Sequence, residues 1–247
     1  MRYEDAAERR PRSRPGQFAQ ILAHPSQRLI RRPMSIHDEG DGWRSFMVKP
    51  VGPATRELVA LHGGDSIDAS PPLGCGFPHA NELGDGPVLL VGGGFGIAPL
   101  HFMARHLDRL PSSPGYRILY GGRTRREVEL DVLEGIRGAL LPSTDDGSLG
   151  FHGTCVDLCR EELRRVDAAS TTVLTCGPHP MMQALVAAVR ESVQEIYVSL
   201  EERMACGVGV CMGCVTPTRG GYVPICTHGP VFRASEVFGV DSQVGHV

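Results

Sequence analysis

The chain has 247 residues, of which 41% are hydrophobic and 21% charged. These are ordinary values for a protein that buries a core, and they exclude a disordered or fibrous chain. A formal net charge of -3 argues against a nucleic-acid-binding protein. The eight cysteines do not indicate a secreted disulfide scaffold, because the chain is long and four of them crowd between Cys206 and Cys226. We therefore expect a cytoplasmic protein.

The N-terminal segment is polar and rich in arginine. Residues 1–17 contain no Val, Ile, Leu or Phe, so we expect a solvated tail over residues 1–14 and no strand there. The most apolar stretch, Pro87 to Leu100, is too short to cross a bilayer and is interrupted by glycines. The sequence thus predicts no membrane segment.

The chain divides into three further regions. Short predicted strands between residues 15 and 83, separated by Gly and Pro residues, indicate a small β-barrel or sandwich. Buried strands then alternate with helices up to about residue 192, which is typical of a parallel sheet. Residues 193–247 hold the cysteine cluster and little periodicity, so this part needs a metal or another domain to hold it. The predicted fold is multi-domain, β plus α/β.

A glycine run follows the buried strand over 88–91 and begins a helix. Its glycines are Gly92, Gly93, Gly94 and Gly96. They let the backbone approach a dinucleotide pyrophosphate, whose charge the helix N-terminus favours. Because the spacing differs from G-x-G-x-x-G, a plain tight turn is an equal alternative. Cys176 and Gly177 lie at a second strand-to-helix boundary, where an open α/β sheet binds its ligand.

The cysteine cluster is the strongest signal. Cys206, Cys211, Cys214 and Cys226 have the C-x4-C-x2-C…C spacing of plant-type [2Fe–2S] proteins. Intervening glycines let a tight loop wrap around a cluster and turn its amides toward the sulfurs. A four-cysteine zinc site is the alternative, although paired C-x2-C knuckles are expected there.

Residues 31–36 carry a possible phosphate site. Two arginines, a loop-stiffening proline and the hydroxyl of Ser35 suit a phosphate, whereas the alternative is a pair of solvated arginines.

Together these motifs resemble the electron-transfer subunit of the NAD-dependent, heteromeric dihydroorotate dehydrogenase, a branch of the ferredoxin reductase-like flavoproteins. The resemblance runs from Pro15 onward. It rests on the stretches 15–18, 32–35, 72–77 and 176–178, and above all on Leu200 through Cys226 with the Gly229–Phe232 segment that follows.

The resemblance implies an FAD-binding β-barrel over 15–83, an NAD-binding α/β domain over 84–192 and a [2Fe–2S] domain over 193–247. It implies a TIM-barrel FMN partner that oxidises dihydroorotate in pyrimidine biosynthesis, in a heterotetramer with two copies of each chain. This chain would pass electrons from that partner through [2Fe–2S] and FAD to NAD+, with Cys176 near the nicotinamide. The implied cofactor-binding residues are Arg32, Pro33, Met34, Ser35, Met47, Val48, Lys49, Ala54, Thr55, Gly92, Gly93, Gly94, Gly96, Cys176 and Gly177. The implied metal ligands are Cys206, Cys211, Cys214 and Cys226.

The sequence also departs from this family. Two β-strands that usually begin the barrel have no counterpart, so its wall is expected to lack them. Ala54 stands where the family has a glycine, and Cys75 where it has an asparagine. Cys155 and Cys159 lie on one predicted helix face and are interpreted as packing residues. Three arginines after a strand could accept a 2′-phosphate, so NADP stays open beside NAD. They are Arg123, Arg125 and Arg126.

Two other functions compete with this one. A hydrogenase-associated or transhydrogenase-type flavoprotein subunit would share the cofactors but have another partner. A zinc-binding interaction module would be no enzyme at all.

Overall fold

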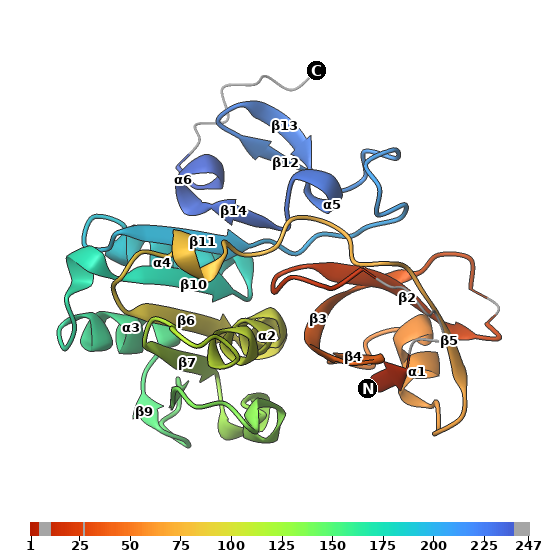
Figure 1. Ribbon diagram of the computed structural model, residues 1–247, viewed down its shortest axis with the longest axis horizontal. Coiled ribbons are helices and arrows are strands. Elements are labelled where there is room, and N and C mark those ends of the chain that lie inside the picture. The colour runs from red at the N-terminus through yellow and green to blue at the C-terminus, as the bar shows by residue number, and fades with distance from the viewer. Residues whose placement is uncertain (5–10, 27, 240–247) are drawn as a thin grey trace.

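The computed structural model describes residues 1–4, 11–26 and 28–239. It contains a five-stranded sheet, a seven-stranded sheet and a two-stranded hairpin. The two larger sheets lie side by side, and the hairpin lies above their junction (Figure 1). This arrangement places the C-terminal region against both of the larger units.

The five-stranded sheet is antiparallel throughout, with the strand order β1-β4-β3-β2-β5. Its elements are β1 (Arg2–Glu4), β2 (Phe18–His24), β3 (Arg32–Gly40), β4 (Trp43–Phe46), β5 (Ser66–Ala69) and α1 (Pro53–Val59). Its core gathers small and aliphatic side chains from β2 around Ile36, Phe46 and Leu58. Within the described residues β1 and β5 each pair on one side only, so the sheet is an open half-barrel.

Strand β1 corrects the expectation of an unstructured tail over residues 1–14. The Met1 amino group donates to the Phe46 carbonyl at 2.7 Å, and the Tyr3 ring stacks on that of Phe46 with centroids 5.7 Å apart. Arg2 lies over the Trp43 ring. Aromatic and cation–π contacts therefore hold this strand, and aliphatic residues are not needed for it.

The seven-stranded sheet has the order β14-β11-β10-β6-β7-β8-β9 and is parallel except for β14. Its strands are β6 (Val88–Gly93), β7 (Tyr116–Gly122), β8 (Ala139–Thr144), β9 (Phe151–His152), β10 (Thr172–Cys176), β11 (Glu195–Ser199) and β14 (Val231–Arg233). Its helices are α2 (Ile97–Asp108), α3 (Cys155–Leu163) and α4 (His179–Val189). The apolar side chains of α2 join one buried cluster and those of α3 and α4 another, so helices cover both faces. The predicted parallel sheet is confirmed.

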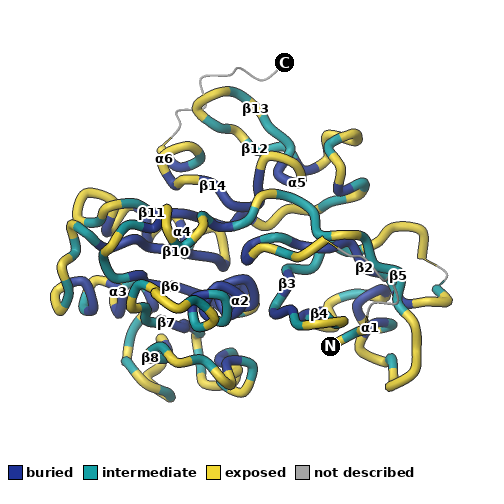
Figure 2. The backbone as a smooth tube through the Cα atoms, viewed as in Figure 1, coloured by how far each residue is buried: buried dark blue, intermediate teal, exposed yellow. Residues whose placement is uncertain are grey.

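Helix α2 also contacts the five-stranded sheet. Its residue Phe102 belongs to the core of that sheet, while Leu100 and Met103 pack in the core of the parallel sheet. In Figure 2 the helix is dark blue over most of its length between the two units. Cys155 and Cys159 are buried in α3, as predicted.

The small C-terminal unit consists of β12 (Val215–Thr218), β13 (Gly221–Pro224), α5 (Ile225–His228) and α6 (Ala234–Val237). The predicted boundary at residue 192 separates β11 from the sheet in which it is hydrogen-bonded to β10. Strand β14 likewise returns to that sheet from beyond the cysteines. We therefore propose to begin the cluster unit after Ser199. None of the helices in the described ranges has the length and hydropathy needed to cross a membrane.

Candidate functional site

A cavity of about 340 Å³ lies where the half-barrel, the parallel sheet and the C-terminal unit meet. Six of the predicted FAD-binding residues line it, namely Pro33, Met34, Ser35, Met47, Lys49 and Thr55. Lys49 reaches across to the parallel-sheet unit, where its Nζ lies 5.7 Å from the centroid of the Phe95 ring. The cavity thus combines apolar walls with a cation and hydroxyl groups, a composition suited to a flavin nucleotide.

Three other predicted FAD-binding residues do not line this cavity. The guanidinium of Arg32 donates to the Ile30 carbonyl at 2.9 Å, and residues 32–35 form the start of β3 where a loop was expected. Val48 lines a different cavity. Ala54 is buried in α1, and Met212 is the one described non-glycine residue with a positive φ. An alanine at position 54 therefore causes no backbone strain.

The predicted glycine run lies at the carboxyl end of β6, where it leads into α2. Gly94 has φ +53°, and no atom lies within 4 Å of the place where its Cβ would be. A Cβ on Gly96 would lie 2.3 Å from the Cys176 carbonyl oxygen, so this glycine lets the loops after β6 and β10 touch. The N-terminus of α2 has no side-chain cap. Its amides and the open face of Gly94 can accept a phosphate group.

Cys176 lies at this junction but has no exposed surface. Burial raises the pKa of its thiol well above the ordinary range. The side chain therefore lies beneath the glycine junction as a neutral thiol, and its proximity to a nicotinamide stays a prediction.

Three cysteines of the motif, Cys206, Cys211 and Cys214, lie in the segment between β11 and β12, here called the cysteine loop, and Cys226 lies in α5. Backbone N–H groups of Val208 and Cys211 donate to Cys206 Sγ at 3.5 and 3.4 Å, and that of Gly209 donates to Cys226 Sγ at 3.1 Å. In the described ranges no three His, Cys, Asp or Glu side chains form a site for a single metal ion. Backbone amides that donate to Cys206 and Cys226 are nevertheless of the kind that surround the sulfurs of an iron–sulfur cluster.

The protonation of these thiols follows from their surroundings. Hydrogen bonds from the Val208 and Cys211 amides lower the pKa of Cys206 to about 6, toward the thiolate that an iron ligand requires. Burial raises the pKa of Cys226 to about 11, and its hydrogen bond with Cys214 adds to that shift. Amide donors of this kind favour additional negative charge on a bound cluster.

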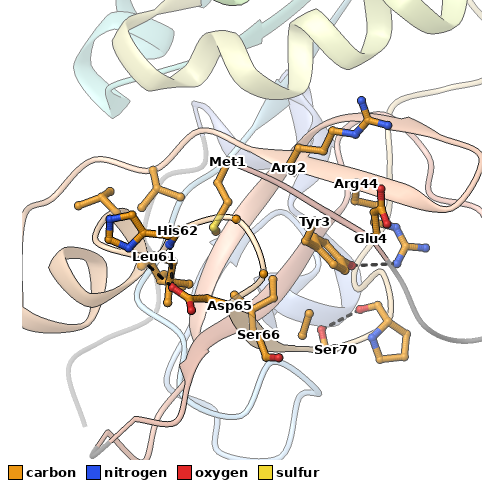
Figure 3. Close-up of a pocket in the computed structure, with 18 of the residues that line it drawn as sticks. Met1, Arg2, Tyr3, Glu4, Arg44, Leu61, His62, Asp65, Ser66 and Ser70 are labelled. Carbon is orange, nitrogen blue, oxygen red and sulfur yellow. Dashed lines mark hydrogen bonds and ion pairs between the residues drawn. The ribbon is translucent and has the colours of Figure 1, made fainter.

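A larger cavity, of about 1380 Å³, lies elsewhere (Figure 3). Its walls come from both edge strands of the half-barrel, including Tyr3 of β1 and Ile67 of β5. Among the predicted cofactor-binding residues, it contains Val48 alone. This space marks the open wall of the half-barrel and contains none of the predicted cluster ligands.

Several residues that line the 340 Å³ cavity were not predicted from the sequence. Phe95 lies within the glycine run, and Glu201, Glu202 and Met204 follow β11. Glu201 is exposed at the cavity wall, yet the dense protein around it raises the pKa of its carboxyl by desolvation. The position of these residues beyond the carboxyl end of a parallel strand was the signal that could have identified them.

Comparison with known proteins shows which family the sequence resembles. Residues 201–238 match the family described as the iron–sulfur cluster binding domain of dihydroorotate dehydrogenase B. The chain is 37% identical over 231 residues to the dihydroorotate dehydrogenase B (NAD(+)) electron transfer subunit of Geobacillus kaustophilus, covering 90% of this chain and 86% of that one. Identity to the same subunit of Clostridium acetobutylicum is 35% over 224 residues, covering 91% and 86%.

Solved structures show the same fold. A chain of the NADH-dependent reduced ferredoxin-NADP oxidoreductase superposes with a TM-score of 0.77 at 32% identity, covering 91% of this chain and 79% of that one. The ferredoxin NADP+ reductase of Neisseria gonorrhoeae superposes with a TM-score of 0.58 at 17% identity, covering 77% and 83%. The predicted ferredoxin reductase-like fold with a C-terminal iron–sulfur unit is confirmed. The chain belongs to the family of electron transfer subunits of dihydroorotate dehydrogenase B.

Proposed function

We propose that this chain is the electron transfer subunit of an NAD-dependent dihydroorotate dehydrogenase in pyrimidine biosynthesis. In this function it carries electrons from a dihydroorotate-oxidising partner to NAD+, and it does not oxidise dihydroorotate itself. Family membership supports the assignment. The chain's own residues support the cofactors: FAD, a [2Fe–2S] cluster and NAD.

One observation carries the proposal: the cavity and the cysteine loop share a wall. Met204 lines the cavity and lies two positions before Cys206, while Pro230 lines it and lies four positions after Cys226. Phe18 belongs both to the cavity wall and to the apolar cluster that holds Cys214 and Cys226. A flavin in the cavity and a cluster in the loop would therefore be neighbours.

Different residues would bind the cluster, the flavin and the nicotinamide dinucleotide. Cys206, Cys211, Cys214 and Cys226 would hold the cluster. Ser35, Lys49 and Thr55 would hold the flavin nucleotide, and the N-terminus of α2 the dinucleotide phosphates. When bound, FAD supplies the exchange between single electrons of an iron–sulfur cluster and the hydride of a nicotinamide. The protein's contribution is to orient these groups and exclude water, so no general base is required from this chain.

The cysteine loop also offers a surface for the partner. Val208, Val210 and Met212 are 54%, 79% and 52% exposed, which is high for large apolar side chains. They surround the exposed Cys211, so a docked partner would cover both the apolar side chains and the cluster edge. We propose that the partner is a TIM-barrel FMN subunit, in a heterotetramer of two copies of each chain. None of the eight cysteines forms a disulfide, which favours a cytoplasmic location.

The test separates the two halves of the electron path. The complex is purified anaerobically and assayed for dihydroorotate:NAD+ and for NADH:dye activity. In Cys211→Ser the first activity should be lost and the second retained. Cys75→Ser is the matched control, because that thiol is also exposed but is not a cluster ligand; both activities should persist. Equal loss of both activities in Cys211→Ser would contradict the proposal that only the dihydroorotate:NAD+ activity needs the cluster.

A second candidate function rests on the 32% identity to the NADH-dependent reduced ferredoxin-NADP oxidoreductase chain. A transhydrogenase-type complex would use the same cofactors with a different partner. Co-purification distinguishes the two functions, because a partner inactive on dihydroorotate but active in NADPH and ferredoxin exchange would favour the second. The match of residues 201–238 to an iron–sulfur domain favours the cluster over the zinc alternative.

A further inference from the structure

Strand β2 presents two different faces. Ala19, Ile21 and Ala23 point into the core of the half-barrel. Because side chains alternate along a strand, Phe18 and Gln20 point the other way. Phe18 packs in the apolar cluster with Cys214 and Cys226, so this outer face of β2 is the floor under the cysteine loop. Gln20 is the polar residue on that floor.

The Gln20 side chain is buried without a hydrogen-bond partner. The residue is 3% exposed, and neither Nε2 nor Oε1 of its amide has a partner. Its backbone is fully engaged, because its N–H donates to Ser70 Oγ at 3.0 Å and its carbonyl accepts from the Ser70 N–H at 2.9 Å. Native proteins rarely leave a buried amide unpaired, since the group then loses its hydrogen bonds to water without replacement. The side chain is therefore placed for a partner other than the residues around it.

That partner lies in the direction of the cysteine loop. A Cβ atom built on Gly207 would lie 2.8 Å from Gln20 Nε2 and 3.0 Å from Gln20 Cγ, and Gly207 has φ +72°. The loop thus passes directly over the amide one residue beyond Cys206. Leu73 closes the other side, with its Cδ1 3.2 Å from the same Cβ position. The amide consequently faces the Cys206 end of the loop, with Leu73 beside the same contact.

We propose that Gln20 is a positioning residue of the iron–sulfur centre, whose Nε2 donates a hydrogen bond to sulfur at the Cys206 end of a bound cluster. The inference rests on the proposed function and adds to it a residue from outside the cysteine motif. A donor to cluster sulfur stabilises the reduced, more negative form and raises the reduction potential. Because β2 belongs to the half-barrel, the amide would also tie the cluster loop to the flavin-binding unit.

The test compares Gln20→Leu, Gln20→His and Gln183→Leu in the complete chain, purified anaerobically with its cluster. Leucine keeps the volume without a donor, histidine restores a donor, and Gln183 is an exposed glutamine on α4 that serves as the control. Redox titration followed by electron paramagnetic resonance reads the cluster potential and g-values, and a chelator assay reads iron loss.

We expect Gln20→Leu to shift the potential to a more negative value, alter the g-values and lose iron about tenfold faster. Gln20→His should return all three toward wild type, and Gln183→Leu should leave them unchanged. An unchanged potential and unchanged g-values in Gln20→Leu with two irons bound would overturn this inference alone. If Gln20→Leu does not fold, Gln20→His provides the test. A histidine donor that lowered the reduction potential below that of the wild type would also overturn the inference about Gln20. Wild-type protein without iron would overturn this inference together with the proposed function.

Discussion

The imidazole rings of His37, on β3, and His101, on α2, stack with centroids 4.1 Å apart and planes 6° from parallel. His101 Nδ1 lies 3.0 Å from the His37 carbonyl oxygen, and His37 Nε2 lies 2.9 Å from that of Val132. One histidine belongs to the half-barrel and the other to the parallel-sheet unit. The stacked pair therefore joins the two units whose junction forms the cavity.

This pair predicts a loss of stability in mild acid. Burial, followed by the neighbouring His101, lowers the pKa of His37 to about 4, and burial also lowers the pKa of His101. An unfolded histidine titrates near 6.5, so the unfolded chain binds more protons between about pH 6.5 and 4. Stability is thus full above pH 6.5 and falls as pH decreases toward 4. Since the rings are partly screened, we expect a loss of about 1–2 kcal/mol between pH 7 and 5.

Urea unfolding at both pH values measures this effect. Three charged groups lie near the pair. Asp38 raises the pKa of both histidines, Arg105 lowers the pKa of His101, and Arg109 pairs with Asp38. All three are kept unchanged in the test. His37→Gln should flatten the pH dependence, whereas His62→Gln, at a side chain 90% exposed, should not. Equal slopes in wild type and His37→Gln would refute the assignment.

A second prediction concerns the buried ion pair of the half-barrel. Arg44 Nε lies 2.9 Å from Glu39 Oε2, with the two side chains 2% and 4% exposed. Arg44 also donates to Ser13 Oγ at 2.8 Å and to the Pro11 carbonyl, so it holds the N-terminal segment on the sheet. Arg44→Met leaves a buried carboxylate unpaired and should lower the free energy of unfolding by about 3–5 kcal/mol.

The matched control is the exposed pair of Arg12 and Asp41, whose side chains are 75% and 93% exposed. Arg12→Met should change the free energy of unfolding by less than about 1 kcal/mol. Urea titrations of both variants measure the difference. Similar small losses of unfolding free energy in both variants would show that the buried pair does not stabilise the half-barrel.

These contacts indicate which features were predictable from the sequence. The glycine run and the cysteine motif are local, because neighbouring residues carry their chemistry, and both were recognised. Strand β1 was missed because it depends on Tyr3 meeting Phe46 across the sheet, which no local pattern records. The orientation of Arg32 was missed for a similar reason, since its strand pairing with Ile21 turns the guanidinium back to the Ile30 carbonyl.

A third prediction concerns the contact between the loops after β6 and β10. A Cβ at Gly96 would lie 2.3 Å from the Cys176 carbonyl oxygen and 2.5 Å from the Gly177 nitrogen, both of which are backbone atoms. Gly96→Ala should therefore force the loops apart, cost about 2 kcal/mol or more and raise the KM for NADH. Gly115→Ala is the control, because nothing lies within 4 Å of its Cβ position. Stability and KM in Gly96→Ala that match those of Gly115→Ala would contradict the proposed role of this contact.

The last prediction concerns thiol reactivity and distinguishes Cys75 from Cys176. Cys75 is exposed, and its thiol donates to the Thr227 carbonyl at 3.5 Å, whereas Cys176 is fully buried with a raised pKa. Because the thiolate is the reactive form, iodoacetamide at pH 8 should label Cys75 in the cluster-loaded protein and leave Cys176 unlabelled until the chain unfolds. Peptide mass spectrometry reads both sites, and Cys75→Ser should remove the early label. Early labelling of Cys176 that NAD+ suppresses would show instead that the junction opens and exposes this thiol where the nicotinamide binds.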